Sequence, residues 1–290
     1  MKKFLIIIPV YNDWESLKKL LNQIDETIKE YDFLEFQCII VNDASNLKEP
    51  KIIKPKNIKF IKIMNMKENR GHARCNAFGI RYAFQNEEFD YLILMDGDGE
   101  DRPIEIKSFI DKIQNEPDKS VVAKRVKRSE GLIFQNLYTL HKLITFIFTG
   151  KKINFGNYSC LTKMDVEKIF SKASLWSSFS GTIKKYIKNY NEINSSRGLR
   201  YFGPSKMSLI NLIVHSFSII AVFRYQVLLR SCIIMSLMIY LSLNFGINLF
   251  FFKVILSIFC LIIFIVSMRE KKAELLNSQE NLNNEKIVTH

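Results

Sequence analysis

The most restrictive feature of this 290-residue chain is an apolar run near its C-terminal end. Residues 227–268 are almost entirely Leu, Ile, Phe, Val, Met, Ser and Cys, and among their few polar residues only Arg230 and Lys253 carry charge. As one helix the run would measure about 63 Å, roughly twice the ~30 Å hydrocarbon core of a bilayer. Two membrane-spanning helices are therefore predicted, with a turn at residues 244–248 centred on Gly246. The alternative is a buried helical hairpin of a soluble protein, but such hairpins rarely stay apolar all round.

Basic residues at the two ends of this run set its expected orientation. Arg224 precedes the run, and Arg269 and Lys271 follow it. Because segments rich in Lys and Arg stay on the cytoplasmic side, both ends are expected there. The prediction is a multi-pass protein of the cytoplasmic membrane whose larger N-terminal part lies in the cytoplasm.

The net positive charge of the chain indicates an anionic binding partner. The chain has 42 Lys and Arg against 29 Asp and Glu, and this net charge of +13 indicates nucleic acid, a phosphorylated substrate or a membrane surface. Nucleic acid is disfavoured because the sequence holds no groove-binding motif and no basic platform interleaved with aromatic residues. The five cysteines lie in apolar surroundings without metal-ligand spacing, which indicates buried, reduced thiols in a cytoplasmic compartment.

The N-terminal half alternates between apolar runs and helical spacing. The run at residues 4–10 is too short for a secretory signal, because polar residues follow it before any small-residue cleavage site, and it predicts a buried strand. Further apolar runs predict strands at 36–41, 58–63 and 91–95, with helices between them such as 73–84. Strands separated by helices predict an α/β fold with a mostly parallel sheet and flanking helices.

Polar and acidic residues follow the predicted strands, at the sheet edge where such folds bind ligands. Asp96-Gly97-Asp98 comes directly after the strand at 91–95. Two carboxylates separated by one small residue suit Mg²⁺ or Mn²⁺, which takes one or two ligands from protein and the rest from phosphate oxygens and water. The loop therefore predicts a metal-bound diphosphate as ligand, with a solvated acidic turn as the alternative.

Two other functions of this acidic loop can be tested on the same residues. A helix-loop-helix calcium site beginning at Asp96 needs Gly at its sixth position and Glu at its twelfth, where the chain has Asp101 and Lys107, so it is excluded. A phosphatase of the haloacid dehalogenase class would have Thr or Val where Glu100 stands. That class stays as the weaker enzyme alternative.

Four motifs occur in order along the first half of the chain: residues 6–13 (IIIPVYND), 39–45 (IIVNDAS), 69–76 (NRGHARCN) and 95–103 (MDGDGEDRP). Together they resemble family 2 glycosyltransferases of the GT-A fold. Residues 203–207 (GPSKM) and the terminal apolar pair are similar to the polyprenyl-phosphate branch of that family, which includes dolichol-phosphate mannose synthases. The resemblance implies a Rossmann-like GT-A domain, a UDP- or GDP-sugar as donor, and Mg²⁺ or Mn²⁺ as cofactor.

The resemblance also assigns donor-binding residues. Pro9, Tyr11 and Asp13 fall where relatives hold the nucleotide base and ribose. Asp43 falls where a carboxylate accepts a hydrogen bond from the base. Asn42 stands where many relatives have a first Asp, which leaves the base selectivity open. For Pro9 and Tyr11 the alternative is an ordinary strand end and loop.

The acidic motif and two arginines are the implied catalytic residues. Asp96, Gly97 and Asp98 match the motif that carries ribose and metal contacts in relatives. Arg125 and Arg128 match arginines that relatives place near the acceptor phosphate. A guanidinium can bind phosphate through two parallel charge-assisted hydrogen bonds, which suits this role. A solvated surface charge is the alternative for each arginine.

A second phosphate-binding segment is implied near the end of the first domain. Arg200, Ser205 and Lys206 match an Arg-x-x-Gly-x-Ser-Lys segment associated with phosphate binding. These side chains suit a phospholipid head group or the departing diphosphate.

The class of acceptor depends on whether a general base is needed. A lipid phosphate is already ionised near neutral pH, whereas a sugar hydroxyl requires a carboxylate within hydrogen-bond reach. Relatives acting on hydroxyls have an acidic pair where this chain has residues 175–179 (LWSSF), which favours polyprenyl phosphate. Asp165, Glu167 and Glu192 stay open as bases, so a saccharide hydroxyl in surface polysaccharide or glycolipid assembly is the alternative acceptor.

The sequence thus predicts a membrane-anchored, inverting, metal-dependent glycosyltransferase, and the inversion is implied by the resemblance alone. A membrane-tethered nucleotide-sugar sensor or scaffold is the non-enzymatic alternative, and a homo-oligomer stays open. The histidines at 72, 141 and 215 lack metal-ligand spacing and receive no role. The expected parts are a cytoplasmic GT-A domain (1–204), an amphipathic interfacial helix (205–226), two transmembrane helices (227–268) and a polar, disordered cytoplasmic tail (269–290).

Overall fold

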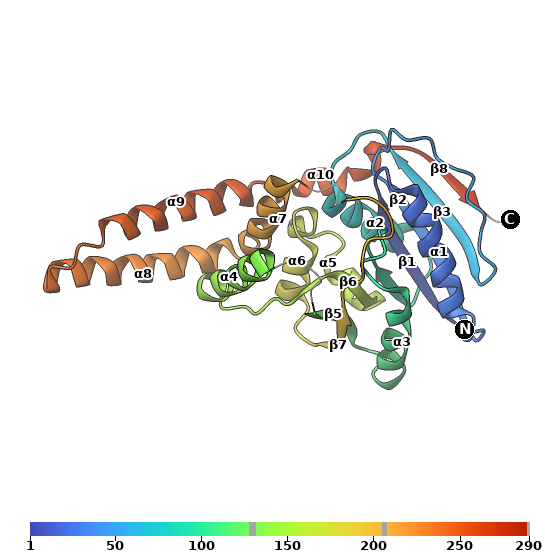
Figure 1. Ribbon diagram of the computed structural model, residues 1–290, viewed down its shortest axis with the longest axis horizontal. Coiled ribbons are helices and arrows are strands. Elements are labelled where there is room, and N and C mark those ends of the chain that lie inside the picture. Colours follow the sequence, from blue (N-terminus) through green and yellow to red (C-terminus); the bar gives the residue numbers. More distant parts are fainter. Residues whose placement is uncertain (128–131, 205–207, 289–290) are drawn as a thin grey trace.

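The computed structural model describes residues 1–127, 132–204 and 208–288, and within them the chain forms one eight-stranded sheet (Figure 1). The strands lie in the order β7-β5-β6-β4-β1-β2-β3-β8. In chain order they are β1 (Lys2–Val10), β2 (Leu34–Asn42), β3 (Ile58–Met66), β4 (Tyr91–Leu94), β5 (Ser120–Lys127), β6 (Phe155–Thr162), β7 (Tyr190–Ser196) and β8 (Leu282–Val288).

The centre of the sheet is parallel, and its outer parts are mixed. β1 pairs in parallel with β2 and β4, and β2 pairs in parallel with β3. β6 runs antiparallel to β4 and β5, while β5 and β7 are parallel. The predicted α/β class is confirmed, with more antiparallel pairing than the alternation of the first hundred residues indicated.

Helices cover both faces of the sheet. The apolar residues of β1 alternate between two buried clusters: Phe4, Ile6 and Ile8 belong to one, and Leu5 and Ile7 to the other. A strand buried on both faces must be continuously apolar, which explains this run. The first cluster includes α1 (Trp14–Ile28) and α3 (Ile106–Asn115), and the second includes α2 (His72–Asn86), α5 (Lys163–Ile169), α6 (Phe179–Tyr186) and the 3₁₀ helix η2 (Ala173–Trp176).

Two long apolar helices leave this domain as a hairpin (Figure 1). α8 (Arg224–Phe245) and α9 (Phe250–Ser267) are about 33 Å and 27 Å long at ~1.5 Å per residue. Both are long and apolar enough to cross a membrane. Gly246 ends α8 in the left-handed conformation, with φ +65°, as the predicted turn at 244–248 requires.

The hairpin exposes its apolar surface. In the most apolar stretches of the two candidate spans, only 11% and 22% of the residues are buried. Large side chains such as Leu243 and Phe250 are 80% and 71% exposed. Contiguous apolar surface of this size is rare on soluble monomers, whereas lipid accommodates it. The alternative of a buried hairpin in a soluble protein therefore does not describe this structure.

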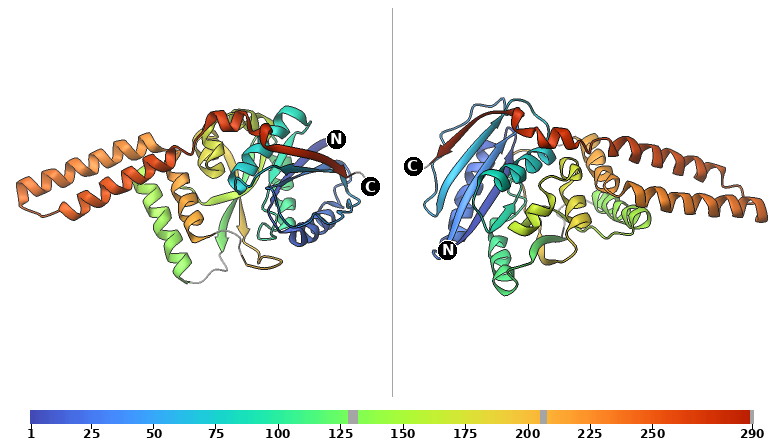
Figure 2. Two further views of the ribbon diagram at one scale, coloured as in Figure 1. Left: turned by 90° about the horizontal axis from the view of Figure 1, so that it is seen from above. Right: turned by 180° about the vertical axis from the view of Figure 1, so that it is seen from behind.

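Two further apolar helices, α4 (Leu132–Thr149) and α7 (Leu209–Ala221), cross the base of the hairpin (Figure 2). Aromatic contacts join these elements: Phe148 of α4 packs against Phe259 of α9 with tilted rings, and Phe217 of α7 meets Phe259 edge to face. α7 lies inside the predicted amphipathic segment 205–226, and Lys185 Nζ donates a hydrogen bond to the Val222 carbonyl at its C-terminal end. The base of the hairpin is thus attached to the domain by packing as well as by chain connection.

The expectation of a disordered tail over 269–290 is wrong for the described residues. After α9 the chain forms α10 (Lys272–Leu276), the 3₁₀ helix η3 (Ser278–Asn281) and β8, which runs antiparallel along β3 (Figure 1). The Trp176 Nε1 donates a hydrogen bond to Glu274 Oε2 at 2.9 Å and ties this return segment to the domain. The tail has a polar composition because β8 is an edge strand with mostly exposed side chains, held chiefly by backbone hydrogen bonds.

The cysteines are all free, and their burial differs between the two parts of the chain. Cys38, Cys75 and Cys160 are buried in the domain, as expected. Cys232 is exposed and Cys260 half-buried, because both lie on the hairpin. The prediction of five buried thiols is therefore corrected for these two.

Candidate active site

The carboxyl ends of three neighbouring strands meet at one edge of the sheet. Val10 is in register with Asn42, and the Asp43 amide donates a hydrogen bond to the Val10 carbonyl at 2.9 Å. On the other side of β1, the Met95 amide donates to the Ile7 carbonyl at 3.2 Å. The polar residues that follow β1, β2 and β4 therefore lie together, as the strand-end argument predicts.

Gly97 is required by a close backbone approach in this region. A Cβ atom at this position would lie 2.9 Å from the Pro9 carbonyl oxygen and 3.1 Å from Ile8 Cγ2. Because backbone cannot move aside as a flexible side chain can, a larger residue would displace the acidic loop from the end of β1. The small residue between Asp96 and Asp98 is what lets both carboxylates sit over that strand end.

The acidic loop concentrates negative charge in a partly enclosed place. Asp96 Oδ1 accepts a hydrogen bond from Asn157 Nδ2 at 3.1 Å, and the Asp96 amide donates to Asp101 Oδ2 at 2.9 Å. Burial, and then the charge of Asp96, raise the pKa of Asp98 to about 6 and that of Asp101 to about 8. The loop therefore holds more negative charge than its own surroundings neutralise.

Arg200 bridges two carboxylates that sequence analysis placed in the donor site. Its Nη1 donates to Asp98 Oδ2 at 2.6 Å, and its Nη2 donates to Asp13 Oδ2 at 2.5 Å. The side chains of Arg200, Asp13 and Asp98 are 16%, 16% and 17% exposed, so water screens these pairs weakly. The resemblance assigns Arg200 to phosphate, whereas in this structure its guanidinium stands as the cation between β1 and the acidic loop.

The segment that carries Arg200 lies along the acidic loop. The Gly198 amide donates to the Glu100 carbonyl at 2.8 Å, and the Tyr201 amide donates to the Asp98 carbonyl at 3.0 Å. Arg197 and Glu100 form an ion pair beside these bonds. The chain after β7 therefore closes one side of the site through backbone as well as side-chain contacts.

Asp43 has a positioning role in this structure. It is buried, and its two carboxylate oxygens accept hydrogen bonds from the Arg70 and Gly71 amides, each at 2.8 Å. These bonds tie the two residues that lead into α2 to the end of β2. A contact between Asp43 and a nucleotide base stays a prediction. Tyr11, predicted to contact the same base, is 38% exposed at this edge.

Arg125 lies close enough to the acidic loop for its charge to act on Asp101. Its Nη2 is 2.5 Å from the point where a Cβ on Gly156 would stand, so the guanidinium rests on that glycine. The next residue, Asn157, binds Asp96. Arg125 makes no ion pair with any carboxylate in the described part of the chain. Three other residues predicted to bind phosphate lie outside the described residues, and their roles stay predictions: Arg128, Ser205 and Lys206.

Two histidines without an assigned role are brought together at this site. His72 is the first residue of α2, and His215 lies on α7; their ring centroids are 5.4 Å apart. Burial lowers the pKa of His215 to about 3, and the positive charges of His72 and Arg125 act in the same direction. Their sequence positions give no signal of this contact, since it depends on how α7 packs across the domain.

The carboxylates considered as general bases lie elsewhere. Tyr91 at the start of β4 is in register with Thr162, so α5, with Asp165 and Glu167, begins at the opposite edge of the sheet. There Asp165 Oδ2 accepts a hydrogen bond from a buried serine hydroxyl at 2.5 Å. Glu192 lies near the start of β7 and pairs with Lys124 at 3.6 Å. None of the three reaches the acidic strand ends.

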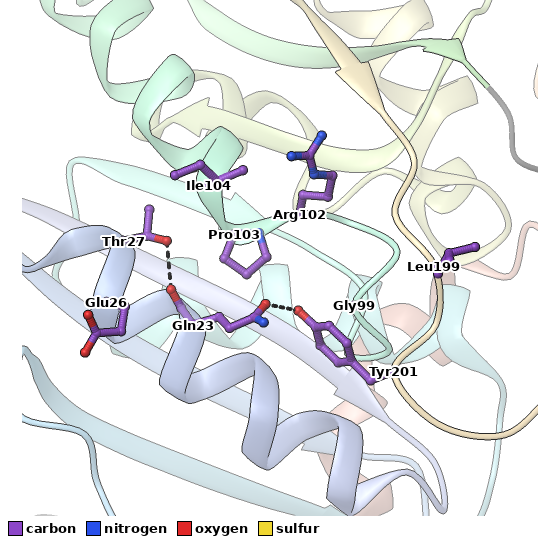
Figure 3. A pocket seen from close by; sticks show the side chains of 9 residues that line it. All are labelled: Gln23, Glu26, Thr27, Gly99, Arg102, Pro103, Ile104, Leu199 and Tyr201. Carbon is purple, nitrogen blue, oxygen red and sulfur yellow. Dashed lines mark hydrogen bonds between the residues drawn. The ribbon is translucent and has the colours of Figure 1, made fainter.

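A pocket of about 400 Å³ lies behind the acidic loop, between α1 and the segment after β7 (Figure 3). Tyr201 donates a hydrogen bond from its hydroxyl to Gln23 Oε1 inside it. Neither Asp96 nor Asp98 lines this pocket, so we place the chemistry at the strand ends instead. The lining residues are Gln23, Glu26, Thr27, Gly99, Arg102, Pro103, Ile104, Leu199 and Tyr201.

The residues of the acidic loop fit a divalent cation that is shared with phosphate. Within the described residues, no group of three or more His, Cys, Asp or Glu side chains is arranged to hold a metal ion by itself. Asp96 and Asp98 offer two carboxylates, which is what Mg²⁺ or Mn²⁺ takes from protein when phosphates supply further ligands. The raised pKa of Asp98 and the guanidinium already seated on it both indicate that a cation belongs there.

Comparison with known proteins identifies the family. The model of a family described as "Glycosyl transferase family 2" matches residues 5–179, which is more than half of the chain. The chain belongs to glycosyl transferase family 2. The match covers the strands that bear the polar edge and ends at the start of α6, so it includes α4 and excludes α7 and the hairpin. The family expected from the four motifs is confirmed.

Several relatives of this family 2 glycosyltransferase carry the same name. The undecaprenyl-phosphate 4-deoxy-4-formamido-L-arabinose transferase of Proteus mirabilis is 26% identical over 219 residues, which is 73% of this chain. Its counterpart in Yersinia pestis is 27% identical over 221 residues. The matched region spans 65% of the length of these relatives, slightly less than two thirds.

Solved structures share the fold of this glycosyltransferase. A mannosyltransferase from Pyrobaculum calidifontis in complex with GDP-Man and Mn²⁺ is 14% identical, with a TM-score of 0.51 over 92% of this chain and 87% of that one. Glucosyl-3-phosphoglycerate synthase from Mycobacterium tuberculosis, with Mn²⁺ and UDP, is 9% identical, with a TM-score of 0.53 over 78% of each chain. At such identities the likeness establishes the fold, and it confirms the predicted GT-A class.

Proposed function

We propose that this enzyme transfers a sugar from a nucleoside diphosphate sugar to a polyprenyl phosphate at the membrane surface. The observation that carries the proposal is the contact between the acidic site and the helix that leads into the apolar hairpin. α7, which leads into the apolar hairpin, brings His215 against His72, two residues from an amide that Asp43 binds. The names of the relatives, which are undecaprenyl-phosphate sugar transferases, support the same acceptor.

The donor would lie along the carboxyl ends of β1, β2 and β4. Tyr11 and Asp13 would contact base and ribose, and Asp96 and Asp98 would hold Mg²⁺ or Mn²⁺. When bound, the metal ion neutralises the diphosphate and stabilises it as a leaving group. Arg200 is close enough to contact the diphosphate once it exchanges its bond to Asp98 for a phosphate oxygen.

The proposed reaction is a single displacement at the anomeric carbon of the sugar. An oxygen of the acceptor phosphate forms the new bond to that carbon. The bond between the carbon and the donor diphosphate breaks, and the nucleoside diphosphate leaves with the bonding electrons. Because the attacking oxygen is already ionised near neutral pH, no protein group has to remove a proton.

The arrangement of carboxylates agrees with this route. Asp165, Glu167 and Glu192, the bases that a hydroxyl acceptor could use, do not reach the acidic edge. Asp96 and Asp98 are committed to the donor side, and Asp101 is buried. Arg125, without a carboxylate partner in the described residues, is placed to bind the incoming phosphate and to stabilise developing negative charge.

The membrane part would deliver the acceptor. The two spans place the ends of the hairpin beside the domain, and basic residues at these ends predict a cytoplasmic active site. α4 and α7, which lie at the base of the hairpin (Figure 2), also expose apolar side chains, among them Leu143 and Ile213. A polyprenyl chain in the membrane could therefore bring its phosphate to the edge of the sheet without leaving the lipid.

The test is a transfer assay with the full-length protein in lipid nanodiscs. Undecaprenyl phosphate, Mn²⁺ and radiolabelled UDP- and GDP-sugars are supplied, and label is counted in the lipid fraction. We expect label in that fraction with one donor, loss of label with EDTA, and release of the sugar by mild acid, as a sugar phosphodiester requires. Asp98→Asn is the inactive control, and Asp111→Asn, an exposed carboxylate on α3, is the matched control.

Three outcomes would contradict the proposal. Label that appears only on an added saccharide and survives mild acid would assign a hydroxyl acceptor. Tight binding of a donor with no turnover for either acceptor class would favour the sensor or scaffold alternative. Phosphate release without any acceptor, together with a phosphorylated Asp96, would instead indicate the phosphatase alternative.

A further inference from the structure

His72 and His215 come from elements with different tasks. His72 opens α2, a core helix whose N-cap residue is tied to the donor edge through Asp43. His215 lies on α7, which packs on the hairpin through Phe217 and Ile220. The two imidazoles meet with ring centroids 5.4 Å apart and an angle of 54° between their planes. A contact between the domain and its membrane base is thus made by two side chains that can bind ligands.

Both imidazoles are available to a ligand. Each residue is only half-buried, and neither ring makes a hydrogen bond to another side chain or backbone group of the described chain. A pair of histidines sealed in a core would ordinarily be hydrogen-bonded. A metal ion is not the ligand that this geometry indicates, because no third His, Cys, Asp or Glu of the described residues completes a metal-binding group.

Several sources of positive charge lie near His72 and His215. Arg125 rests on Gly156, one residue from the asparagine that binds Asp96. Its charge and that of His72 both act on His215. α2 adds its N-terminal end: the amides of its first two residues lack acceptors inside the helix, and its first turn contains no acidic residue. Helix ends of this kind bind phosphate.

The apolar surroundings indicate where the anion comes from. α7 exposes Ile213, and the neighbouring α4 exposes Leu143 and Phe146, at 48%, 54% and 45%. The helices that carry these side chains lie at the base of the hairpin (Figure 2), whereas Asp13, Asp98 and Arg200 pair with one another at the strand ends. An anion that reaches His215 from the base of the hairpin arrives with an apolar tail in the membrane.

We propose that His72, His215 and Arg125 form the subsite that binds the phosphate monoester of the acceptor. Each imidazole donates one N–H to a phosphate oxygen, and the guanidinium of Arg125 binds the remaining charge. α7 thereby supplies one phosphate ligand directly from the membrane side. This proposal rests on the proposed function, because it names the residues that hold the acceptor of that reaction.

The test measures binding to the full-length protein in detergent micelles. The probes are farnesyl phosphate, farnesol and inorganic phosphate, together with Mn²⁺ and UDP or GDP as a measure of the donor side. The variants are His72→Leu, His215→Leu and their combination, because leucine has no N–H donor. Asn211→Ala, at an exposed polar position of α7, is the matched control. His72→Arg tests the conservative replacement, because arginine keeps N–H donors that can bind phosphate.

We expect each leucine variant to bind farnesyl phosphate about tenfold more weakly or worse, since the hydrogen bond from the replaced imidazole to a charged group is lost. Binding of farnesol and of Mn²⁺ with nucleotide should not change, and His72→Arg should retain most of the affinity for farnesyl phosphate. In the transfer assay the same variants should raise KM for the lipid and leave KM for the donor unchanged.

Four results would overturn the proposal. Unchanged binding of farnesyl phosphate in the double variant would show that the histidines do not hold phosphate. Equal loss of Mn²⁺–nucleotide binding would assign them to the donor side or to the fold. Loss confined to inorganic phosphate would assign the site to a free anion. Failure of the wild-type protein to bind farnesyl phosphate, with donor binding intact, would refute the acceptor class itself and so separate the two proposals.

Discussion

Asp98→Asn should lower sugar transfer, and its effect on the free energy of unfolding should depend on pH. The Asp98 carboxyl has its pKa raised from 3.8 to about 6, first by burial and then by the charges of Asp96 and Glu100. The folded protein therefore holds a proton on this group between about pH 4 and pH 6 that the unfolded chain releases. Stability supplied by the protonated form is lost as the pH rises through that range.

The raised pKa of Asp98 sets the size of this change in stability. A pKa raised from 3.8 to about 6 costs the folded state roughly 3 kcal/mol once the group is ionised in both states, at ~1.4 kcal/mol for each tenfold change in proton affinity. The amide introduced by Asp98→Asn removes this cost. It cannot accept from both Arg200 and the Glu100 amide, which costs about 1–3 kcal/mol.

The variant should therefore be less stable than the wild type at pH 4 and equally or more stable at pH 8. The difference between the two free energies of unfolding should change by roughly 3 kcal/mol over this range, or by several degrees in Tm. Denaturant unfolding in micelles with EDTA measures it, with Asp111→Asn as the matched control at an exposed carboxylate. Sugar transfer by Asp98→Asn should fall about 100-fold or more, because metal binding is lost.

A stability difference that is the same at pH 4 and pH 8 would refute the idea that Asp98 carries uncompensated charge. Wild-type transfer by the variant in Mn²⁺ would refute its assignment to the metal. The two results are independent, since the first concerns the metal-free protein and the second concerns turnover.

Three further predictions concern the frame around the site. Gly97→Ala should lower turnover about tenfold or more, since its Cβ would stand 2.9 Å from the Pro9 carbonyl oxygen; wild-type kinetics would contradict that contact. Removal of residues 282–290 should leave the edge of β3 unpaired and cause aggregation on size-exclusion chromatography, whereas a monodisperse truncated protein would show that β8 is dispensable. Ile258→Lys, at a side chain of α9 that is 51% exposed, should cost about 2.5–3.5 kcal/mol of membrane insertion and increase extraction by carbonate; unchanged extraction would mean that this face does not meet lipid.

Local patterns predicted the elements that bear the site. The apolar runs at 4–10, 36–41, 58–63 and 91–95 correspond to β1, β2, β3 and β4, because a strand covered by helices on both faces has to be apolar throughout. Gly246 marked the turn of the hairpin because few residues tolerate its positive φ. In the acidic motif, the glycine between two carboxylates is explained by the backbone of β1 beneath it.

The elements that were missed depend on long-range contacts. β8 has mostly exposed side chains, so neither burial nor periodicity distinguishes it from a polar tail; pairing with β3 creates the strand. Arg200 matched a phosphate-binding pattern, and only the fold shows that Asp13 and Asp98 hold its guanidinium. His72 and His215 lack any shared motif, because their contact arises where α7 crosses the end of α2.

The sequence by itself determined the strand and helix periods, the acidic loop and the apolar hairpin, since each depends on residues within about one element of each other. The tertiary structure decided which charges face one another. Coulomb energies depend on distances and burial that only the packed chain defines. The pairing of Arg200 with two carboxylates, the raised pKa of Asp98 and the meeting of two histidines beside Arg125 all follow from that packing.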